Sequence, residues 1–121
     1  MSTTTTTTIA VEQGDRAVAW RMIAPSASGG KVYSIAINGT AVATCWGRAR
    51  TAGPSGAGAQ GRVARYRTPG EAFAAAQQAT LSKEGAGYSL DIPPRTVTAP
   101  ASTTLPVTDA VGMVLRDGSP V

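Results

Sequence analysis

The sequence predicts an α+β fold: a small antiparallel β-sheet with one α-helix packed across one face, flanked by extended N- and C-terminal arms. Three observations predict it: short segments in which apolar and polar residues alternate, an Asn-Gly pair between two of them, and one alanine-rich segment that opens with a capping sequence. The 121 residues are enough for one domain. We expect a Thr-rich leader at 1–15, a folded domain at 16–92 and a Pro/Thr-rich tail with a short apolar patch at 93–121.

The first half of the domain is a series of strands. Residues 17–23 alternate, and we expect Trp20 to belong to the core. Residues 31–37 also alternate, and residues 40–48 return antiparallel to them, because Asn38-Gly39 is a strong signal for a two-residue hairpin turn. On this hairpin, alternation groups two sets of side chains on single faces: Tyr33, Ile35 and Ile37 on the first strand, and Val42, Thr44, Trp46 and Arg48 on the second.

The second half is expected to contain a strand, the helix and a closing strand. A Gly/Pro-rich loop at 51–60 precedes a strand at 61–67. Thr68 is placed to cap a helix, with Pro69 at its first position and Glu71 three residues after the cap. The helix follows through residues 72–83 and ends at Gly85 and Gly87; a strand at 88–92 closes the sheet. The expected anchors of the helix on the sheet are Phe73 and Leu81.

Both ends of the chain are poor in groups that pack. The leader is polar, so we expect it to be mobile unless a partner holds it. Residues 92–108 contain four prolines and many threonines, which is typical of an extended linker. The apolar patch that follows either docks on another chain or folds back on its own domain, and the pattern favours neither. Its residues are Val111, Met113, Val114 and Leu115.

Positive charge is concentrated in one stretch. The net charge is +4 with a pI near 9.8, and no acidic residue lies between Asp15 and Glu71. Such a block repels itself unless solvent or an anionic partner faces it, so it indicates either a polyanion-binding surface or a solvated basic face. The stretch contains eight of the eleven basic residues: Arg16, Arg21, Lys31, Arg48, Arg50, Arg62, Arg65 and Arg67.

The composition excludes several functions. There is no histidine, and Cys45 is the single cysteine, so an internal disulfide and His-dependent nucleophilic catalysis are excluded, and a zinc site has no plausible ligand set. We expect Cys45 to be a small apolar filler in a strand. We also expect no cofactor, no metal and no paired carboxylates for acid–base catalysis. No apolar run reaches the roughly 20 residues of a membrane span and the N-terminus does not read as a signal peptide, so we expect a cytoplasmic protein without a membrane partner.

Several landmarks follow one another in order along residues 17–92. They are Lys31-Val32-Tyr33-Ser34-Ile35, Trp46-Gly47-Arg48, Gln60-Gly61-Arg62, Tyr66, Thr68-Pro69-Gly70-Glu71-Ala72, Lys83 and Gly87-Tyr88. In this order the sequence resembles the WGR domain family, a small nucleic-acid-associated module found in DNA-damage-responsive poly(ADP-ribose) polymerases and in bacterial proteins. The resemblance covers most of the foldable chain.

The resemblance implies a small antiparallel sheet with a helix across it, and a role in binding nucleic acid. In the polymerases, the motif's Trp and Arg meet nucleic acid near a strand break, which makes Trp46 and Arg48 the leading contact candidates and Lys31 a secondary one. The sequence departs from the family at Ala49-Arg50, where a branched aliphatic residue and Gly are usual, and in its longer loop before Gln60. No catalytic polymerase domain accompanies the module, so we expect no enzymatic activity.

The sequence therefore supports two hypotheses for the function of this chain. The first is a non-enzymatic nucleic-acid-binding module, DNA more than RNA, in which arginines grip phosphates and Trp46 stacks on a base or sugar instead of packing under the helix. The second is a structural or adaptor subunit of a larger assembly, such as a viral particle, whose ends at 1–15 and 93–121 contact neighbouring subunits. The predicted nucleic-acid-binding residues are Trp46, Arg48, Arg50, Arg62, Arg65, Arg67 and Lys31.

Overall fold

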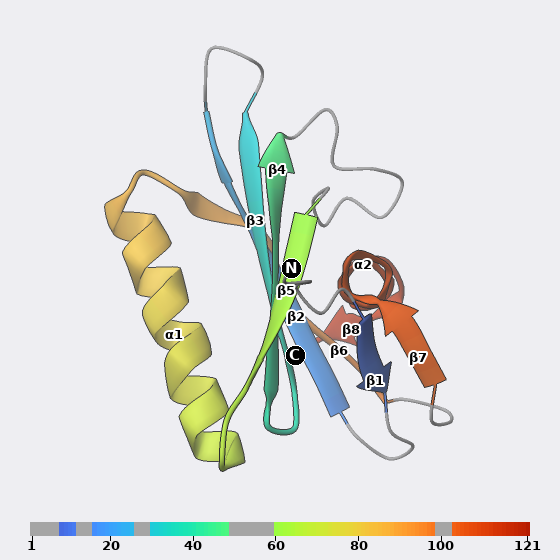
Figure 1. Cartoon of the computed structure of the whole chain (residues 1–121). Coiled ribbons are helices and arrows are strands. Elements are labelled where there is room, and N and C mark those ends of the chain that lie inside the picture. Colours follow the sequence, from blue (N-terminus) through green and yellow to red (C-terminus); the bar gives the residue numbers. More distant parts are fainter. Residues whose placement is uncertain (1–7, 12–15, 26–29, 49–59, 99–102) are drawn as a thin grey trace, which may run out of the picture.

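A six-stranded antiparallel sheet forms the centre of the molecule (Figure 1). The computed structural model describes residues 8–11, 16–25, 30–48, 60–98 and 103–121. The strand order is β5-β4-β3-β2-β6-β8, and one helix lies on each face of the sheet. The strands are β2 (Arg16–Ala24), β3 (Lys31–Asn38), β4 (Ala41–Arg48), β5 (Gln60–Arg65), β6 (Ser89–Thr98) and β8 (Ser119–Pro120).

The predicted hairpin of β3 and β4 is confirmed, with a small difference at its turn. Asn38 pairs with Ala41, so the two turn residues are Gly39 and Thr40 instead of Asn38 and Gly39. Of these two turn residues, Gly39 has a positive φ of +62° and Thr40 does not; glycine adopts this conformation at little cost. The register aligns Tyr33 with Trp46, which sets the two rings side by side on one face of the sheet.

The first helix, α1 (Pro69–Gly85), begins as the sequence predicts. Thr68 is the N-cap, and its Oγ1 accepts a hydrogen bond of 3.1 Å from the Glu71 N–H. The Glu71 carboxylate accepts a 3.1 Å bond from the Arg67 N–H, one residue earlier than the usual capping box. At the other end Gly87 has a φ of +99°, and the Tyr88 N–H donates to the Lys83 carbonyl, which turns the chain into β6.

The face that α1 turns to the sheet is made of alanines, and the predicted anchors are wrong. Ala72 and Ala76 are fully buried, whereas Phe73 and Leu81 are 52% and 60% exposed. The sheet supplies the bulk of this core layer, because Trp20, Met22, Ile35 and Val42 project toward the helix. Small helix residues let the backbone approach these large side chains closely, so the large residues of the helix remain outside.

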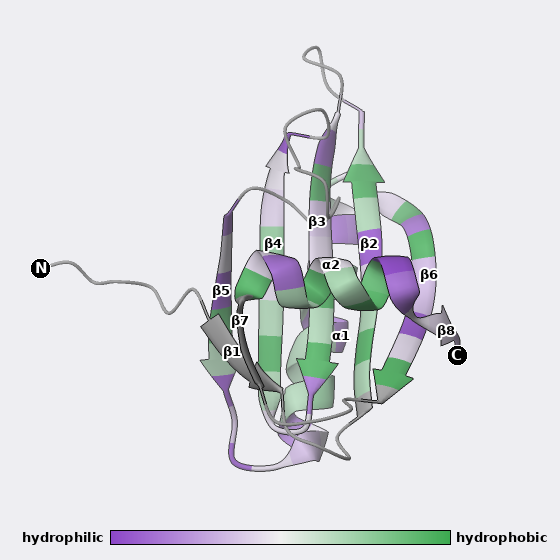
Figure 2. Ribbon diagram, turned by 90° about the vertical axis from the view of Figure 1, so that its right-hand side faces the viewer, coloured by the Kyte–Doolittle hydropathy of each residue, from purple (hydrophilic) through white to green (hydrophobic). Residues whose placement is uncertain are grey.

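A second helix corrects the predicted one-helix fold. The segment α2 (Val107–Asp117) crosses the other face of the sheet (Figure 2). It covers a layer of small sheet residues that includes Ala19, Ala43 and Cys45. The predicted apolar patch thus folds back on its own chain, and the expected extended C-terminal arm is not extended here. The buried residues of α2 recur on one side of the helix: Val107, Ala110, Val111, Val114 and Leu115.

The expected boundary after residue 92 falls inside a strand. β6 pairs with β2 on both sides of Pro93-Pro94, from Ser89 to Thr98. A register shift in β2 between Ala19 and Arg21 faces the prolines, so the strand continues around them as an irregularity. The former linker is therefore in part a strand of the main sheet.

The leader also contributes a strand. β1 (Thr8–Val11) pairs antiparallel with β7 (Thr103–Pro106) in a separate two-stranded sheet. The mobile leader expected at 1–15 is thus replaced by a paired strand at 8–11, and its remaining residues lie outside the described ones. Residues from the two predicted arms therefore meet each other.

Candidate functional site

A concave site lies on the α1 face of the sheet, where β3 begins, β4 ends and α1 reaches its C-terminal turn. Its volume is about 530 Å³, within the range of small-molecule and cofactor pockets. We call it the basic-aromatic pocket. Its lining residues are Lys31, Tyr33, Thr44, Trp46, Gly47, Arg48, Arg62, Lys83 and Tyr88.

Strand register brings the sheet residues of the pocket together. Lys31 pairs with Arg48, and Tyr33 pairs with Trp46 on the same two strands. On the next strand Arg62 pairs with Thr44. Directly paired side chains on one face have Cβ atoms about 5 Å apart, so adjacent strands alone gather these groups into one patch.

Helix α1 adds a lysine whose position is set by two tyrosines. The Lys83 Nζ lies 4.5 Å from the ring centroid of Tyr33 and 5.3 Å from that of Tyr88. The two rings meet edge to face, with centroids 6.4 Å apart and an interplanar angle of 69°. Each cation–π contact favours the ammonium over the ring, so Lys83 is held at the pocket as a fixed positive charge.

The charge of the pocket is of one sign. Among the described residues that line it, four carry a positive charge and none is acidic. Lys31, Arg48 and Arg62 are exposed, while Trp46 is partly buried. Burial raises the pKa of the Tyr33 phenol. The hydrogen bond with Thr44 and the nearby Arg62 lower this pKa, but the net shift is upward, so Tyr33 is neutral at physiological pH.

The structure brings together four of the seven predicted site residues: Lys31, Trp46, Arg48 and Arg62. Trp46 is a wall of the pocket, which agrees with a contact role more than with a position under the helix. Arg50 lies outside the described residues.

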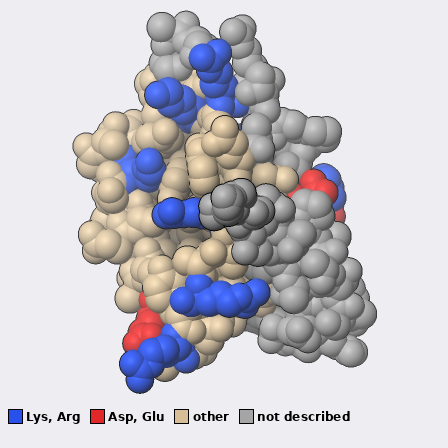
Figure 3. All heavy atoms as spheres, in the orientation of Figure 1, with Lys and Arg blue, Asp and Glu red and all other residues tan. Residues whose placement is uncertain are grey.

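The other two predicted residues belong elsewhere. Arg65 pairs with Ala41 at the opposite end of β4, and it lies on the α2 face because it is three positions after Arg62 along the strand. Arg67 precedes the cap of α1 at that same end. Figure 3 shows the wider picture: lysine and arginine side chains form several separate groups over the face in view. The predicted arginines are therefore divided between two places: Arg48 and Arg62 lie at the pocket, and Arg65 and Arg67 lie at the other end of β4.

Sequence reasoning missed three contributors: Tyr33, Lys83 and Tyr88. Two signals for them were available. Tyr33 is itself the hairpin partner of Trp46, and the Gly87-Tyr88 pair follows the helix that carries Lys83. The missing information is tertiary, because only the packing of α1 across β3 places Lys83 above the tyrosines.

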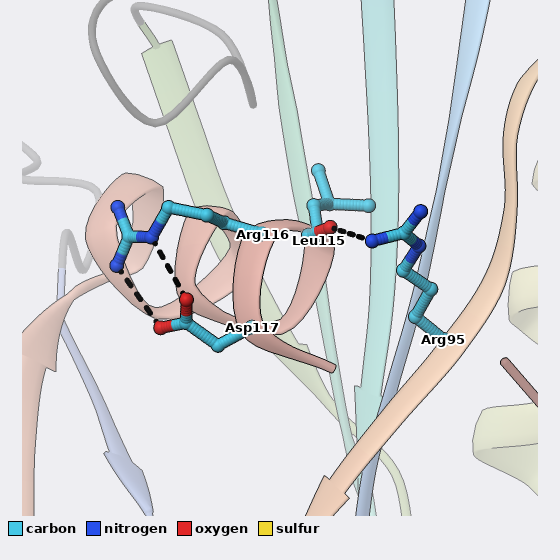
Figure 4. A network of polar contacts seen from close by, with 4 residues as sticks. All are labelled: Arg95, Leu115, Arg116 and Asp117. Atoms are coloured by element: carbon cyan, nitrogen blue, oxygen red, sulfur yellow. Dashed lines mark hydrogen bonds and ion pairs between the residues drawn. The ribbon is translucent and has the colours of Figure 1, made fainter. Parts of the chain in front are cut away.

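Three arginines away from the pocket have structural partners within the described part of the chain. The Arg21 Nε donates to Asp91 Oδ2 at 2.8 Å, which joins β2 to β6. The Arg95 Nη1 donates to the Leu115 carbonyl at the end of α2, and Arg116 pairs with Asp117 (Figure 4). Arg95 of β6 thus ties the C-terminal end of α2 to the sheet.

Cys45 has the filler role that the sequence predicts. It is fully buried under α2, and burial raises the pKa of its thiol to about 12. Such a thiol is not a nucleophile at neutral pH. Within the described ranges, no three His, Cys, Asp or Glu residues are grouped as metal ligands would be.

Comparison with protein-family models, with curated proteins and with solved structures finds no match for this chain. In the described part of the chain, neither helix combines the length and the apolar character needed to cross a membrane.

Proposed function

We propose that this chain is a non-enzymatic nucleic-acid-binding module and that the basic-aromatic pocket is its contact site. One observation carries the proposal: four cations and three aromatic rings from β3, β4, β5, α1 and the residue before β6 converge on one pocket. Phosphates bind guanidinium and ammonium groups, and unpaired bases stack on aromatic faces, so this pairing of groups fits a nucleic-acid strand better than it fits a simple anion.

The pocket divides the work between two kinds of residue. Arg48 and Arg62 stand on neighbouring strands and present planar donors suited to successive phosphates. Trp46 offers an indole face for a base or sugar, and stacking of this kind contributes about 1–3 kcal/mol per base. Contacts to phosphate and to a ring face carry little sequence information, so we expect binding with weak sequence preference.

The support for DNA over RNA is the resemblance of the Trp46-Gly47-Arg48 segment and its companions to the WGR family. The support for a binding role without catalysis is chemical. The sequence has no histidine, and its one thiol is buried and protonated. The basic lining groups of the pocket are guanidinium and ammonium donors, which suit it to bind phosphates.

The test compares two arginines of one strand. Arg62 lines the pocket and Arg65 lies on the other face of β5, so Arg62→Gln and Arg65→Gln remove the same charge from two places. Binding to a nicked DNA duplex, a single strand and a structured RNA is measured across a salt series. We expect Arg62→Gln to reduce the slope of log K against log salt by about 0.7–0.9 and Arg65→Gln to leave it nearly unchanged.

Equal effects of the two substitutions would contradict the proposal, since they would show that net charge alone determines binding. Trp46→Leu separates stacking from charge. We expect it to weaken binding by about tenfold on single-stranded probes with no change in the salt slope, because no ion pair is lost.

The adaptor hypothesis has less support, because part of its proposed contact segment is buried. Its proposed C-terminal arm includes residues 107–117, which are buried against the sheet of the same chain as α2. An adaptor role therefore needs a surface elsewhere on the molecule, and one such surface exists.

A further inference from the structure

A second concave surface lies on the other flank of α1. It is a groove of about 610 Å³ between α1, β2 and β6. Its floor is Trp20 and Val18, and its walls are apolar side chains that solvent reaches: Phe73 and Leu81 on α1, Leu90 on β6 and the terminal Val121. We call it the apolar groove. Its lining residues are Val18, Trp20, Phe73, Gln77, Thr80, Leu81, Glu84, Leu90, Pro94 and Val121.

The exposure of these side chains is unusual for a small domain. Phe73, Leu81 and Leu90 are 52%, 60% and 50% exposed, and they adjoin one another around one groove. Isolated exposed apolar residues need no explanation, but a contiguous apolar patch marks an interaction surface. The polar group of the floor, the Trp20 indole N–H, already donates a hydrogen bond of 2.9 Å to Thr80 Oγ1, so it needs no hydrogen-bond acceptor from a partner.

The geometry of the sheet indicates the shape of the missing partner. On the other face α2 crosses the sheet, while on this face α1 lies mainly against β3 and β4 (Figures 1 and 2). β2 and β6 are left beside α1 as a strip about 10 Å wide, since neighbouring strands are about 4.8 Å apart. That is the width of one α-helix, and helices pack side by side at about 8–10 Å.

The charge of the groove indicates the chemistry of the partner. Glu84 is the only charged residue among those described along its lining, in a chain that is basic overall. A second copy of α1 would present the same outward stripe, Phe73, Gln77, Leu81 and Glu84, which contains no cation to pair with Glu84. A different helix with a basic residue beside its apolar stripe satisfies both the groove and the carboxylate.

We propose that the apolar groove docks an amphipathic α-helix of a partner protein, with its apolar face on Trp20, Leu81 and Leu90 and a Lys or Arg opposite Glu84. This proposal is independent of nucleic-acid binding, because the basic-aromatic pocket shares no lining residue with the groove. It gives the chain a protein-binding surface on the flank of α1 instead of on its terminal segments.

The probe is a phage-displayed library of helical peptides in which one face varies among apolar residues and one flanking position is Lys, Glu or Gln. Selection on the full chain should enrich apolar residues at i, i+4 and i+7 with Lys at the flank. Leu81→Asp should weaken the enriched peptide by about tenfold or more, whereas Gln78→Asp, on the same helix outside the groove, should leave binding within about twofold. Glu84→Lys should reverse the preference from the Lys peptide to the Glu peptide.

Three outcomes would overturn the proposal: no enrichment of an apolar helical stripe, equal binding by the Leu81→Asp and wild-type chains, or a wild-type dimer in sedimentation that Leu81→Asp dissolves. The last would identify the groove as a self-association surface. Leu81 is exposed, so thermal unfolding should show that its replacement leaves the fold intact. Retained DNA binding by Leu81→Asp separates failure here from failure of the nucleic-acid proposal.

Discussion

Gly61 on β5 gives a direct test of the way α2 packs, because a side chain of α2 occupies the space that a Cβ atom at position 61 would need. A Cβ atom at this position would lie 2.6 Å from Val107 Cγ1, 3.1 Å from Cys45 Sγ and 3.2 Å from the Thr44 carbonyl oxygen. Val107 is buried and β-branched, so its methyl group has few other rotamers to adopt. Gly61→Ala must therefore push α2 away from the sheet.

The sign of the effect is diagnostic. In an unobstructed strand, replacing glycine by alanine stabilises a protein by about 0.5–1 kcal/mol. Here overpacking should dominate and lower the free energy of unfolding by about 1–3 kcal/mol. The matched control is Gly70→Ala in the first turn of α1, where the nearest atom is 3.9 Å away, and we expect it to be neutral or slightly stabilising.

A double-mutant cycle makes the argument specific to α2. Val107→Ala alone should cost about 2 kcal/mol, because it removes two buried methyl groups. Combined with Gly61→Ala it should cost clearly less than the sum, because the smaller side chain makes room for the new methyl group. Urea unfolding followed by circular dichroism measures each free energy. Strict additivity, or stabilisation by Gly61→Ala, would show that α2 does not rest on β5.

Four further outcomes are expected. With its thiol pKa raised to about 12, Cys45 should be only about one part in ten thousand thiolate at pH 8 and should react with a disulfide reagent only after unfolding. The folded chain keeps this proton, while the unfolded chain loses it above about pH 9. The free energy of unfolding should therefore fall by up to about 1.4 kcal/mol per pH unit between about pH 9 and pH 12. The fall should be steeper in the wild type than in Cys45→Ala. Thr68→Ala should cost about 1 kcal/mol in thermal unfolding because the Glu71 N–H loses its acceptor, whereas the surface substitution Gln78→Ala in the middle of α1 should cost nothing measurable. Lys83→Gln should reduce the salt slope of DNA binding by about 0.7–0.9, and an unchanged slope would show that Lys83 meets no phosphate.

The hairpin and the start of α1 were predictable because their signals are local. Alternation over β3 and β4 fixes which residues share a face, and Thr68, Pro69 and Glu71 specify a helix start within four residues. The grouping of Lys31 with Arg48 follows from the hairpin register once the turn is placed. These parts of the candidate site needed no tertiary information beyond one turn.

The C-terminal third was misread because proline and threonine dominated its composition. Pro93-Pro94 indicates the end of a strand, because proline cannot donate to a neighbouring strand. β6 nevertheless continues past them. On one side β8 pairs only with Arg95 and Thr96, and on the other side the register with β2 shifts opposite the prolines. The signal for α2 was present in its spacing, with apolar residues at i, i+3, i+4, i+7 and i+8 from Val107 to Leu115. Periodicity was the better guide there, and composition the worse one.

The arginines show a different limit. Arg62 and Arg65 are close in sequence but an odd number of residues apart on one strand, so they face opposite sides of the sheet. Density of charge along a chain therefore does not predict density of charge on a surface. Which cation joins the pocket is decided by strand parity and by the reach of α1, and only the first of these can be read from sequence.

Helix α1 explains how one small domain can carry two different surfaces. Its buried side is alanine, so its large apolar side chains, Phe73 and Leu81, remain exposed. Successive residues are about 100° apart around a helix, which sends Lys83 toward Tyr33 and Tyr88 and lets Leu81 and Glu84 line the opposite flank. A helix anchored by Phe73 and Leu81, as its composition alone suggests, would have buried the groove and turned Ala72 and Ala76 outward. The two candidate sites therefore depend on the same fact, that the sheet and not the helix supplies the bulk of this core layer.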